Sequence, residues 1–418
     1  MTRRGLIAGL SATGVLPLFS EAQTGSARIV VIGGGFGGAT AARTMKALAP
    51  RLSVTLVEPR ETYVACPFSN LVIGGMREIM DQGFRYNGVA ATGVEVIRAR
   101  ADAVDPTTQI VTLEGGETLS YDRLILSPGV DIRWGAIAGY GRTAIRRMPH
   151  AWKAGAQTVL LRQQLREMED GGTVVMSVPP APYRCPPGPY ERASLIANYL
   201  KREKPRSKLV VLDAKDGFSK KPLFLEAWSE RYPDHLEWRG ASDDGRVSRV
   251  DPETLTFETD FDTVQADVAN VIPPQKASQI ADRAGVTDAT GWCPVDPVTF
   301  ESTRQPNIHV IGDAAIMAPM PKSAFAANAQ GKVCAIQVAR LLAGQAPQPT
   351  VLANTCYSYV GAEAAVSVVG VYRLGGTAIS EVSDAGGISP LAAAPAIRQA
   401  EAAQANHWFG AITSETFG

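Results

Sequence analysis

Residues 27–48 read ARIVVIGGGFGGATAARTMKAL, a short apolar run followed by glycines and then by small residues at helical spacing. This pattern predicts a buried strand, a tight turn and a helix packed closely on that strand. Gly33, Gly35 and Gly38 let the backbone approach a pyrophosphate at the N-terminus of the helix. The next strand, LSVTLVEP, ends in Glu58, which is placed to accept a hydrogen bond from a ribose hydroxyl. The stretch therefore predicts an adenine dinucleotide site.

The chain length and charge narrow the class of protein further. With 418 residues and 45% hydrophobic residues, the chain is long enough for two or three globular domains. Its 41 basic residues cancel its 41 acidic residues. This balance predicts no nucleic-acid partner and no attraction to an anionic membrane surface.

The first residues differ from the rest, since Arg3 and Arg4 precede an apolar stretch from Leu6 to Phe19 that glycines and a proline interrupt. The stretch is too short to span a bilayer but fits a twin-arginine export signal. We expect residues 1–27 to be this signal peptide, which predicts a periplasmic protein without an integral membrane segment in the mature chain. The alternative is a disordered start with a chance arginine pair.

Two later segments indicate which dinucleotide binds. YDRLILSPGVD (residues 121–131) reads as a strand running into a turn at Gly129, and NIHVIGDAA (residues 307–315) as a strand ending in Gly312 and Asp313. A helical segment, SAFAANAQGKVCAIQVARLLAG, follows. In this order the segments resemble the two-dinucleotide flavoprotein superfamily. The resemblance implies that FAD is the dinucleotide and that Asp313 holds its ribityl and phosphate region, with Gly129 and Gly312 beside it.

A second nucleotide-type domain is predicted from the strands at residues 174–178 and 208–214. Where nicotinamide-using relatives have a glycine-rich loop, this chain reads PPAPYRCPPGPYERA. Proline lacks the backbone N–H that binds phosphate, so we expect no functional NAD loop.

The predicted fold is therefore α/β, with two Rossmann-like dinucleotide-binding domains of the glutathione-reductase-like kind and a C-terminal α+β domain. The expected boundaries are 28–150 and 265–345 for the FAD-binding domain, 151–264 for the second Rossmann-like domain, and 346–418 for the C-terminal domain.

The chain has five cysteines, and none of their spacings resembles a metal site or a c-type haem attachment motif. We therefore expect no metal and no haem on this chain. Cys185 lies in the proline-rich loop, which is expected near the flavin. To take part in redox chemistry it needs a substrate or a second sulfur, and Cys356, in LANTCYSYVG, is the best-placed candidate.

Several segments together resemble the flavoprotein subunit of flavocytochrome c sulfide dehydrogenase. They are VVMSVPPAPYRCPPGPYERASLIANYLK, VIPPQKASQIADRAG, GWCPVD, ANTCYSYV and NHWFGAITSETFG. The resemblance implies that Cys185 and Cys356 form a redox disulfide on one face of FAD, where sulfide reacts. It also implies that Cys66, in TYVACPFSNLVIGG, bonds covalently to the flavin. The electron acceptor it implies is a c-type cytochrome subunit, because the haem must belong to a second polypeptide.

The remaining candidates have less specific interpretations. Cys334 is expected in the core and Cys293 in a structural role, whereas Trp408 and Phe409 are expected beside the flavin, at a partner surface or in the core. Two rival functions stay open. One is a sulfide:quinone oxidoreductase, although the tail lacks the dense apolar face of an interfacial anchor. The other is a non-catalytic flavoprotein accessory of a sulfur-oxidising system.

Overall fold

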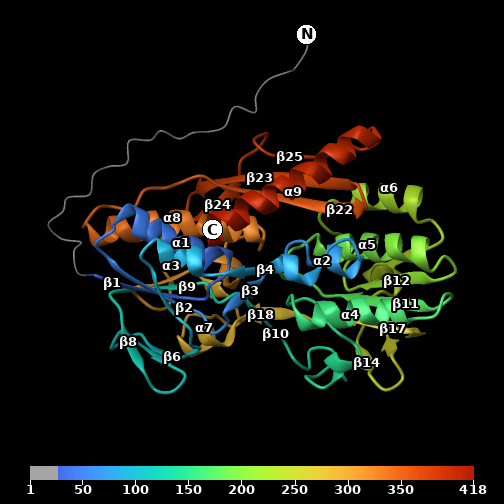
Figure 1. Cartoon of the computed structure of the whole chain (residues 1–418), viewed down its shortest axis with the longest axis horizontal. Coiled ribbons are helices and arrows are strands. Elements are labelled where there is room, and N and C mark those ends of the chain that lie inside the picture. The colour runs from blue at the N-terminus through green and yellow to red at the C-terminus, as the bar shows by residue number, and fades with distance from the viewer. Residues whose placement is uncertain (1–26) are drawn as a thin grey trace, which may run out of the picture.

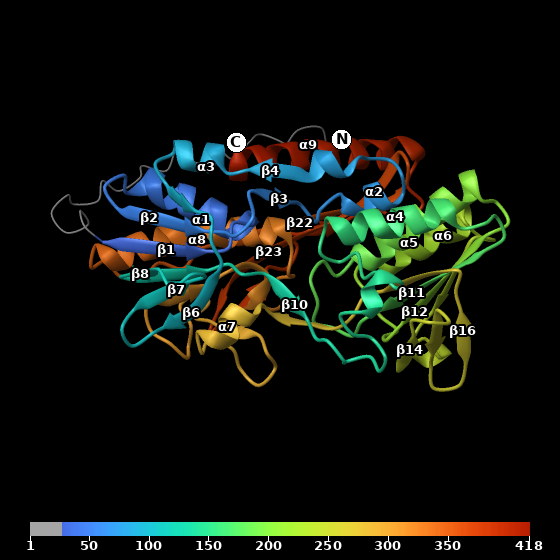
Figure 2. The same ribbon diagram turned by 60° about the horizontal axis from the view of Figure 1, so that its bottom comes forward.

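The structure, a computed structural model, describes residues 27–418 (Figure 1). Apart from Ala27, the signal peptide predicted at residues 1–27 lies outside the described residues. Two helix-covered parallel sheets lie side by side, and the C-terminal strands and helix run across both of them (Figures 1 and 2). The predicted fold class, α/β with two Rossmann-like domains and a C-terminal α+β domain, is confirmed.

The first sheet is parallel and carries the glycine-rich turn at its centre. Its strands lie in the order β20-β9-β1-β2-β5. Their bounds are β1 (Arg28–Ile32), β2 (Ser53–Val57), β5 (Glu95–Ile97), β9 (Arg123–Leu126) and β20 (Ile308–Val310). The sheet therefore joins segments from both predicted parts of the FAD-binding domain.

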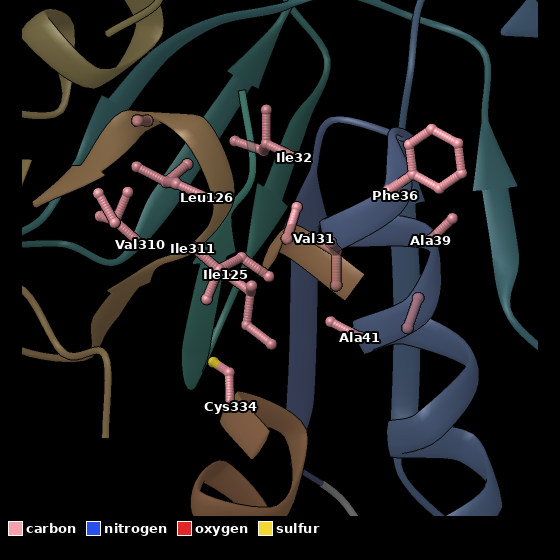
Figure 3. Close-up of a cluster of buried hydrophobic side chains, with 14 of the residues drawn as sticks. Val31, Ile32, Phe36, Ala39, Ala41, Ile125, Leu126, Val310, Ile311 and Cys334 are labelled. Atoms are coloured by element: carbon pink, nitrogen blue, oxygen red, sulfur yellow. The ribbon is translucent and has the colours of Figure 1, made fainter. Parts of the chain in front are cut away.

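Two helices pack on this sheet, α1 (Phe36–Leu48) and α8 (Ala324–Leu342). The core between them and the strands includes Val31, Ile125 and the buried thiol of Cys334 (Figure 3). The two helices touch at Gly331, where an added Cβ would lie 2.5 Å from the carbonyl oxygen of Gly37. Because only glycine permits this approach, α8 is held directly against the helix that begins at the dinucleotide fingerprint.

The second sheet is also parallel, with the strand order β13-β12-β11-β17. Its strands are β11 (Thr173–Val178), β12 (Lys208–Asp213), β13 (Leu236–Arg239) and β17 (Val268–Val271). Near it lie α4 (Ala156–Glu167), α5 (Gly188–Glu203) and α6 (Lys221–Arg231). The proline-rich loop joins β11 to α5, at the carboxyl edge of this sheet.

Smaller sheets, short helices and turns lie between the strands of the two parallel sheets along the chain. Two three-stranded antiparallel sheets are β6 (Ala101–Asp105), β7 (Ile110–Leu113), β8 (Thr118–Ser120), and β14 (Arg249–Asp251), β15 (Thr256–Glu258), β16 (Thr263–Gln265). Two-stranded pairs are β3 (Thr62–Val64) with β4 (Gly83–Arg85), β10 (Val130–Ile132) with β18 (Gln275–Ala277), and β19 (Cys293–Pro294) with β21 (Ala315–Ile316). The short helices are α2 (Ser69–Ile73), α3 (Asn87–Ala91), α7 (Gln279–Arg283), and the 3-10 turns η1 (Ile79–Gln82), η2 (Ala144–Arg146), η3 (Ala241–Asp243) and η4 (Gly312–Ala314).

The C-terminal region is an antiparallel sheet with one long helix. It comprises β22 (Leu352–Gly361), β23 (Ala364–Gly375), β24 (Ala378–Glu381), β25 (Gly387–Ile388) and α9 (Pro395–Phe417). The end of α9 lies against the half of the molecule that holds the first parallel sheet, called the FAD half below. There Phe417 stacks on Tyr63 with ring centroids 5.2 Å apart. Across residues 27–418, no helix has the length and apolarity needed to cross a bilayer.

Candidate functional site

A large cavity lies where the two parallel sheets and the C-terminal sheet meet. It holds about 1570 Å³ of empty space, its open mouth included. Among the residues that line it are nearly all the predicted site residues: Gly33, Gly35, Glu58, Cys66, Gly129, Cys185, Gly312, Asp313 and Cys356. The remaining one, Gly38, lies one helical turn behind the wall.

Close backbone approach requires glycine at two positions of the fingerprint, Gly33 and Gly38. Gly33 has φ +99°, and an added Cβ there would lie 2.3 Å from the carbonyl oxygen of Ser127. A Cβ on Gly38 would lie 1.9 Å from the carbonyl oxygen of Gly33. Gly35 faces the cavity at the N-cap of α1. The turn therefore presents bare backbone and the positive end of α1 to the cavity.

Glu58 lies at the end of β2 and its side chain is almost fully buried. Its carboxylate accepts hydrogen bonds from the N–H of Gly34, at 3.0 Å, and of Arg60, at 3.1 Å. These bonds fix the carboxylate at the edge of the cavity, where its remaining acceptor capacity faces a ligand.

Asp313 lies on the opposite wall, in η4 after β20. Its Oδ1 is buried and has no hydrogen-bond partner among the described residues. Burial raises the pKa of this carboxyl, and the nearby cations Arg184 and Lys322 oppose that effect. A buried carboxylate oxygen without a partner is costly, so this atom is suited to a ligand hydroxyl.

These features fit an adenine dinucleotide with a long second half. The fingerprint and Glu58 would hold the adenosine ribose and pyrophosphate, and Asp313 would hold a hydroxyl-bearing chain between pyrophosphate and ring. The cavity then leaves its widest lining, with three of the five cysteines, for the ring system. FAD is the dinucleotide that matches this donor and acceptor set.

Cys185 sits on the cavity wall in a left-handed conformation, with φ +55°. Its N–H donates to the carbonyl oxygen of Lys322 at 2.8 Å, and its own carbonyl accepts from the N–H of Gly188 at 2.8 Å. Prolines 186 and 187 follow it and restrict the backbone. The loop is thus anchored to the FAD half and presents the thiol in one position.

Cys356 comes from β22 and lines the same cavity as Cys185, and the two thiols are close enough to influence each other's pKa. Both are free thiols in this structure. Their interaction raises the pKa of Cys185 and lowers the pKa of Cys356, although burial acts to raise both. The predicted pair is therefore brought together, and Cys356 is the member that more readily carries negative charge.

Cys66, between β3 and α2, is half-buried on the same cavity. Its Sγ lies 3.9 Å from the carbonyl oxygen of Trp152. That carbonyl also accepts a hydrogen bond from Arg184, the residue before Cys185. The three thiols therefore share one cavity, whereas Cys293 and Cys334 are fully buried in the core, as expected.

A buried arginine supports the wall behind the cysteines. Arg192, in α5, is 1% exposed. Its guanidinium donates to Asn70, Asn270 and the carbonyl oxygens of His150 and Ala151 at 2.6–3.0 Å. Since the acceptors come from three segments, this one side chain ties α5 to α2, to β17 and to the connection at His150 and Ala151.

His150 in this cluster is expected to make the protein acid-sensitive. Its Nδ1 accepts a hydrogen bond from the N–H of Trp152 at 2.9 Å, and burial lowers its pKa to about 3. The unfolded chain takes up this proton below about pH 6.5, whereas the folded protein does so only near pH 3. Stability is therefore complete above pH 6.5 and is lost as the pH falls toward 3. Between pH 7 and pH 5 the loss amounts to about 2 kcal/mol.

Denaturant unfolding at pH 7 and pH 5 measures this loss of stability. The proteins compared are the wild type, His150→Asn and His407→Asn. Asparagine keeps an acceptor but does not titrate, so His150→Asn loses about 2 kcal/mol less than wild type on acidification. His407 is exposed and serves as the matched control. Equal losses in wild type and His150→Asn contradict the assignment.

The carboxyl edge of the second sheet is filled by side chains. Asp213, at the end of β12, accepts hydrogen bonds from Tyr190 at 2.7 Å and Trp238 at 3.1 Å and pairs with Lys215 at 2.7 Å. Tyr190 also stacks on Phe218, with ring centroids 3.6 Å apart. Asp213 is the acidic residue that would bind a ribose hydroxyl in a second dinucleotide site. Its carboxylate is already bonded to protein groups.

Sequence reasoning missed two polar residues of the site. Glu191 lines the cavity. Its carboxylate accepts a hydrogen bond from the side chain of Asn70 at 2.7 Å and another from the N–H of Tyr359 at 2.9 Å. Burial raises the pKa of Glu191. Arg192 was missed with it, although both stand in the quoted loop segment. Trp408 also lines the cavity, and Phe409 is buried against Phe68, with ring centroids 4.5 Å apart. No cluster in residues 27–418 has the ligands to hold a metal ion.

Three family descriptions match this chain. Residues 158–273 match "Sulfide dehydrogenase (flavocytochrome c) flavoprotein chain, central", and residues 348–417 match "Flavocytochrome c sulphide dehydrogenase, flavin-binding". Residues 27–159 match "Pyridine nucleotide-disulphide oxidoreductase".

Individual proteins agree with these matches. The sulfide dehydrogenase (flavocytochrome c) flavoprotein chain of Chlorobaculum thiosulfatiphilum is 58% identical over 48 residues, which cover 12% of this chain and all of that sequence. The mitochondrial sulfide:quinone oxidoreductase of Mus musculus is 24% identical over 344 residues, 76% of this chain and 72% of that protein. The X-ray structure of the sulfide:quinone oxidoreductase from Aquifex aeolicus superposes with a TM-score of 0.74 at 18% identity, covering 93% of this chain and 92% of that one.

Proposed function

Because this chain belongs to the flavoprotein chains of flavocytochrome c sulfide dehydrogenase, we propose that it oxidises sulfide at Cys185 and Cys356 and passes the electrons through FAD to a c-type cytochrome on a second polypeptide. Both cysteines line the cavity that the dinucleotide fingerprint also lines, and this shared placement carries the proposal. We further propose that the chain is a periplasmic protein exported by the twin-arginine route.

The two cysteines do the sulfur chemistry. When they are joined as a disulfide, a hydrosulfide anion attacks one sulfur; a new sulfur–sulfur bond forms, the old one breaks, and the other cysteine leaves as a thiolate. FAD, when bound, accepts the electron pair and hands it on one electron at a time. The chain's own part is to hold both sulfurs in place, through the proline-fixed loop and β22, on one cavity.

The acceptor we favour is the cytochrome rather than membrane quinone. The C-terminal helix α9 directs Phe409, Ile412 and Phe417 into the interior instead of toward a lipid surface. A quinone-linked enzyme docks through an apolar face that lies in the membrane interface. The similarity to the mouse sulfide:quinone oxidoreductase makes quinone the alternative to test.

An anaerobic mixing experiment tests the function. The purified holoprotein is mixed with sulfide while the flavin absorbance is followed, and then either oxidised cytochrome c or a soluble quinone is added. We expect bleaching, followed by rapid reoxidation with cytochrome c and slow reoxidation with quinone. A flavin that does not respond to sulfide overturns the proposal in favour of a non-catalytic accessory. Faster reoxidation by quinone than by cytochrome c would show that quinone is the acceptor.

Covalent attachment of the flavin through Cys66 gives a separate prediction. Wild-type protein denatured in detergent keeps a fluorescent flavin on the chain, whereas Cys66→Ser releases nearly all of it, because serine forms no thioether. Gel fluorescence after denaturation measures this. Cys334→Ala, a change in the core away from the cavity, is the matched control and keeps the flavin. Flavin that stays on denatured Cys66→Ser refutes the linkage.

A further inference from the structure

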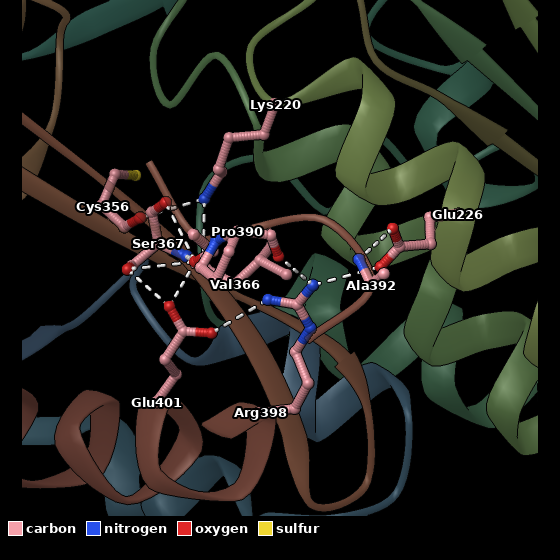
Figure 4. A network of polar contacts seen from close by, with 10 residues as sticks. Lys220, Glu226, Cys356, Val366, Ser367, Pro390, Ala392, Arg398 and Glu401 are labelled. Carbon is pink, nitrogen blue, oxygen red and sulfur yellow. Dashed lines mark hydrogen bonds and ion pairs between the residues drawn. The ribbon is translucent and has the colours of Figure 1, made fainter. Parts of the chain in front are cut away.

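A buried lysine lies behind Cys356. Lys220 is the N-cap of α6, has φ +63°, and its side chain is 4% exposed. Its Nζ donates to the carbonyl oxygen of Cys356 at 3.0 Å, to the hydroxyl of Ser358 at 2.8 Å and to the carbonyl oxygen of Val366 at 3.4 Å (Figure 4). All three acceptors are uncharged groups of β22 and β23.

The carboxylates that face Lys220 are engaged elsewhere. Glu191, from α5, accepts from Asn70 and from the backbone of Tyr359. Glu401, from α9, accepts from Ser367 and Ser389 and pairs with Arg398 (Figure 4). The other groups near the ammonium are the two thiols Cys185 and Cys356 and the ring of Phe224, 5.9 Å away. Within residues 27–418 the ammonium therefore has no carboxylate bonded to it.

An ammonium buried with neutral partners is expensive to keep. Burial lowers the pKa of Lys220, and negative charge on Cys356 is the largest influence that raises it again. The same interaction, seen from the sulfur, helps to lower the pKa of Cys356. Because Lys220 donates to the carbonyl oxygen of Cys356 itself, its ammonium is held beside this residue. The arrangement becomes favourable when the sulfur is anionic.

We propose that Lys220 is a positioning residue whose cation stabilises negative charge on the sulfur of Cys356 whenever its bond to Cys185 is open. The inference rests on the proposed function. Lys220 does not line the cavity and does not touch sulfide, so it acts only through Cys356. Attack by hydrosulfide leaves one sulfur with the added sulfur and the other as an anion. Lys220 favours the states in which the anionic charge is on Cys356.

The test measures the acidity of Cys356 without sulfide. In the Cys185→Ser holoprotein, the rate at which iodoacetamide alkylates Cys356 is followed against pH by mass spectrometry of its peptide. We expect Lys220→Met in this background to raise the midpoint by about one pH unit or more, as removal of a close opposite charge does. Lys220→Arg, which keeps the charge, restores most of the shift.

Lys221 provides the matched control. It is the next residue, is more exposed, and donates instead to the carbonyl oxygen of Asp216 at 2.8 Å. Lys221→Met should leave the midpoint unchanged. An unchanged midpoint in Lys220→Met, with flavin retained, overturns the proposal.

The parent measurement decides the matter even where Lys220→Met fails to fold. A midpoint below about pH 8.5, the value of a free thiol, supports the proposal because burial alone raises it, and a midpoint above that value overturns it. Alkylation needs no sulfide turnover. A shift in Lys220→Met together with a wild-type protein whose flavin does not respond to sulfide would therefore reject the proposed function while leaving the role of Lys220 intact.

Discussion

We expect the Cys185→Ser holoprotein to be reduced by sulfide at least about a thousandfold more slowly than wild type, with its FAD still bound. Loss of a group that forms the covalent bond in a reaction typically costs this much or more. A serine hydroxyl keeps the volume of the side chain but forms no bond to Cys356. Its neighbours, the carbonyl oxygen of Lys322 and the N–H of Gly188, bond only to the backbone and stay in place.

Stopped-flow absorbance of the flavin under anaerobic conditions measures the rate. Cys334→Ala is the matched control, since the thiol of Cys334 is 0% exposed and lies in the core. This substitution should leave the rate within about twofold of wild type. Cys356→Ser is expected to behave like Cys185→Ser. Reduction of Cys185→Ser at the wild-type rate would remove the dithiol from the mechanism.

The second large effect is expected at Gly38. Its added Cβ would lie 1.9 Å from the carbonyl oxygen of Gly33, and neither group is a flexible side chain. Helix α1 must therefore move away from β1, which opens the pyrophosphate turn. We expect Gly38→Ala to lose about 3 kcal/mol of stability, the upper end for overpacking, and to purify with little flavin.

Gly410→Ala makes the comparison sharp. Gly410 is also a helical glycine, in α9, but it is exposed and an added Cβ there meets nothing within 4 Å. Alanine at such a position stabilises a helix by about 0.5–1 kcal/mol. Thermal midpoint and flavin content of both variants are the measurements. A Gly38→Ala protein with full flavin content and a wild-type thermal midpoint would contradict the prediction, because it would show that the turn accommodates a Cβ at this position.

The dinucleotide half of the site was predictable because its chemistry is local. Gly33, Gly38 and Glu58 are within one strand–turn–helix–strand unit, and the steric demand for glycine is written into that unit. The departure at the second nucleotide loop was equally visible, since prolines remove the N–H groups that phosphate needs.

The groups that hold the sulfurs were not predictable in the same way. Arg192 acquires its role from acceptors in three other segments, and Lys220 from strands more than a hundred residues later. A single sequence contains no signal for such convergence. The hydrogen bonds from Tyr190 and Trp238 to Asp213 are another case, because in the sequence each aromatic residue looks like an ordinary core residue. Only the fold brings the three side chains together.

The last helix has a consequence for biosynthesis. Thr416 and Asn328 both hydrogen-bond to Thr40, and an added Cβ at Gly88 would lie 2.3 Å from the carbonyl oxygen of Phe417, so the last turn of α9 packs against segments that are synthesised early. A ribosome still holding these residues prevents α9 from docking. Helix α9 can therefore pack against the first parallel sheet and its helices only after Phe417 has left the ribosome.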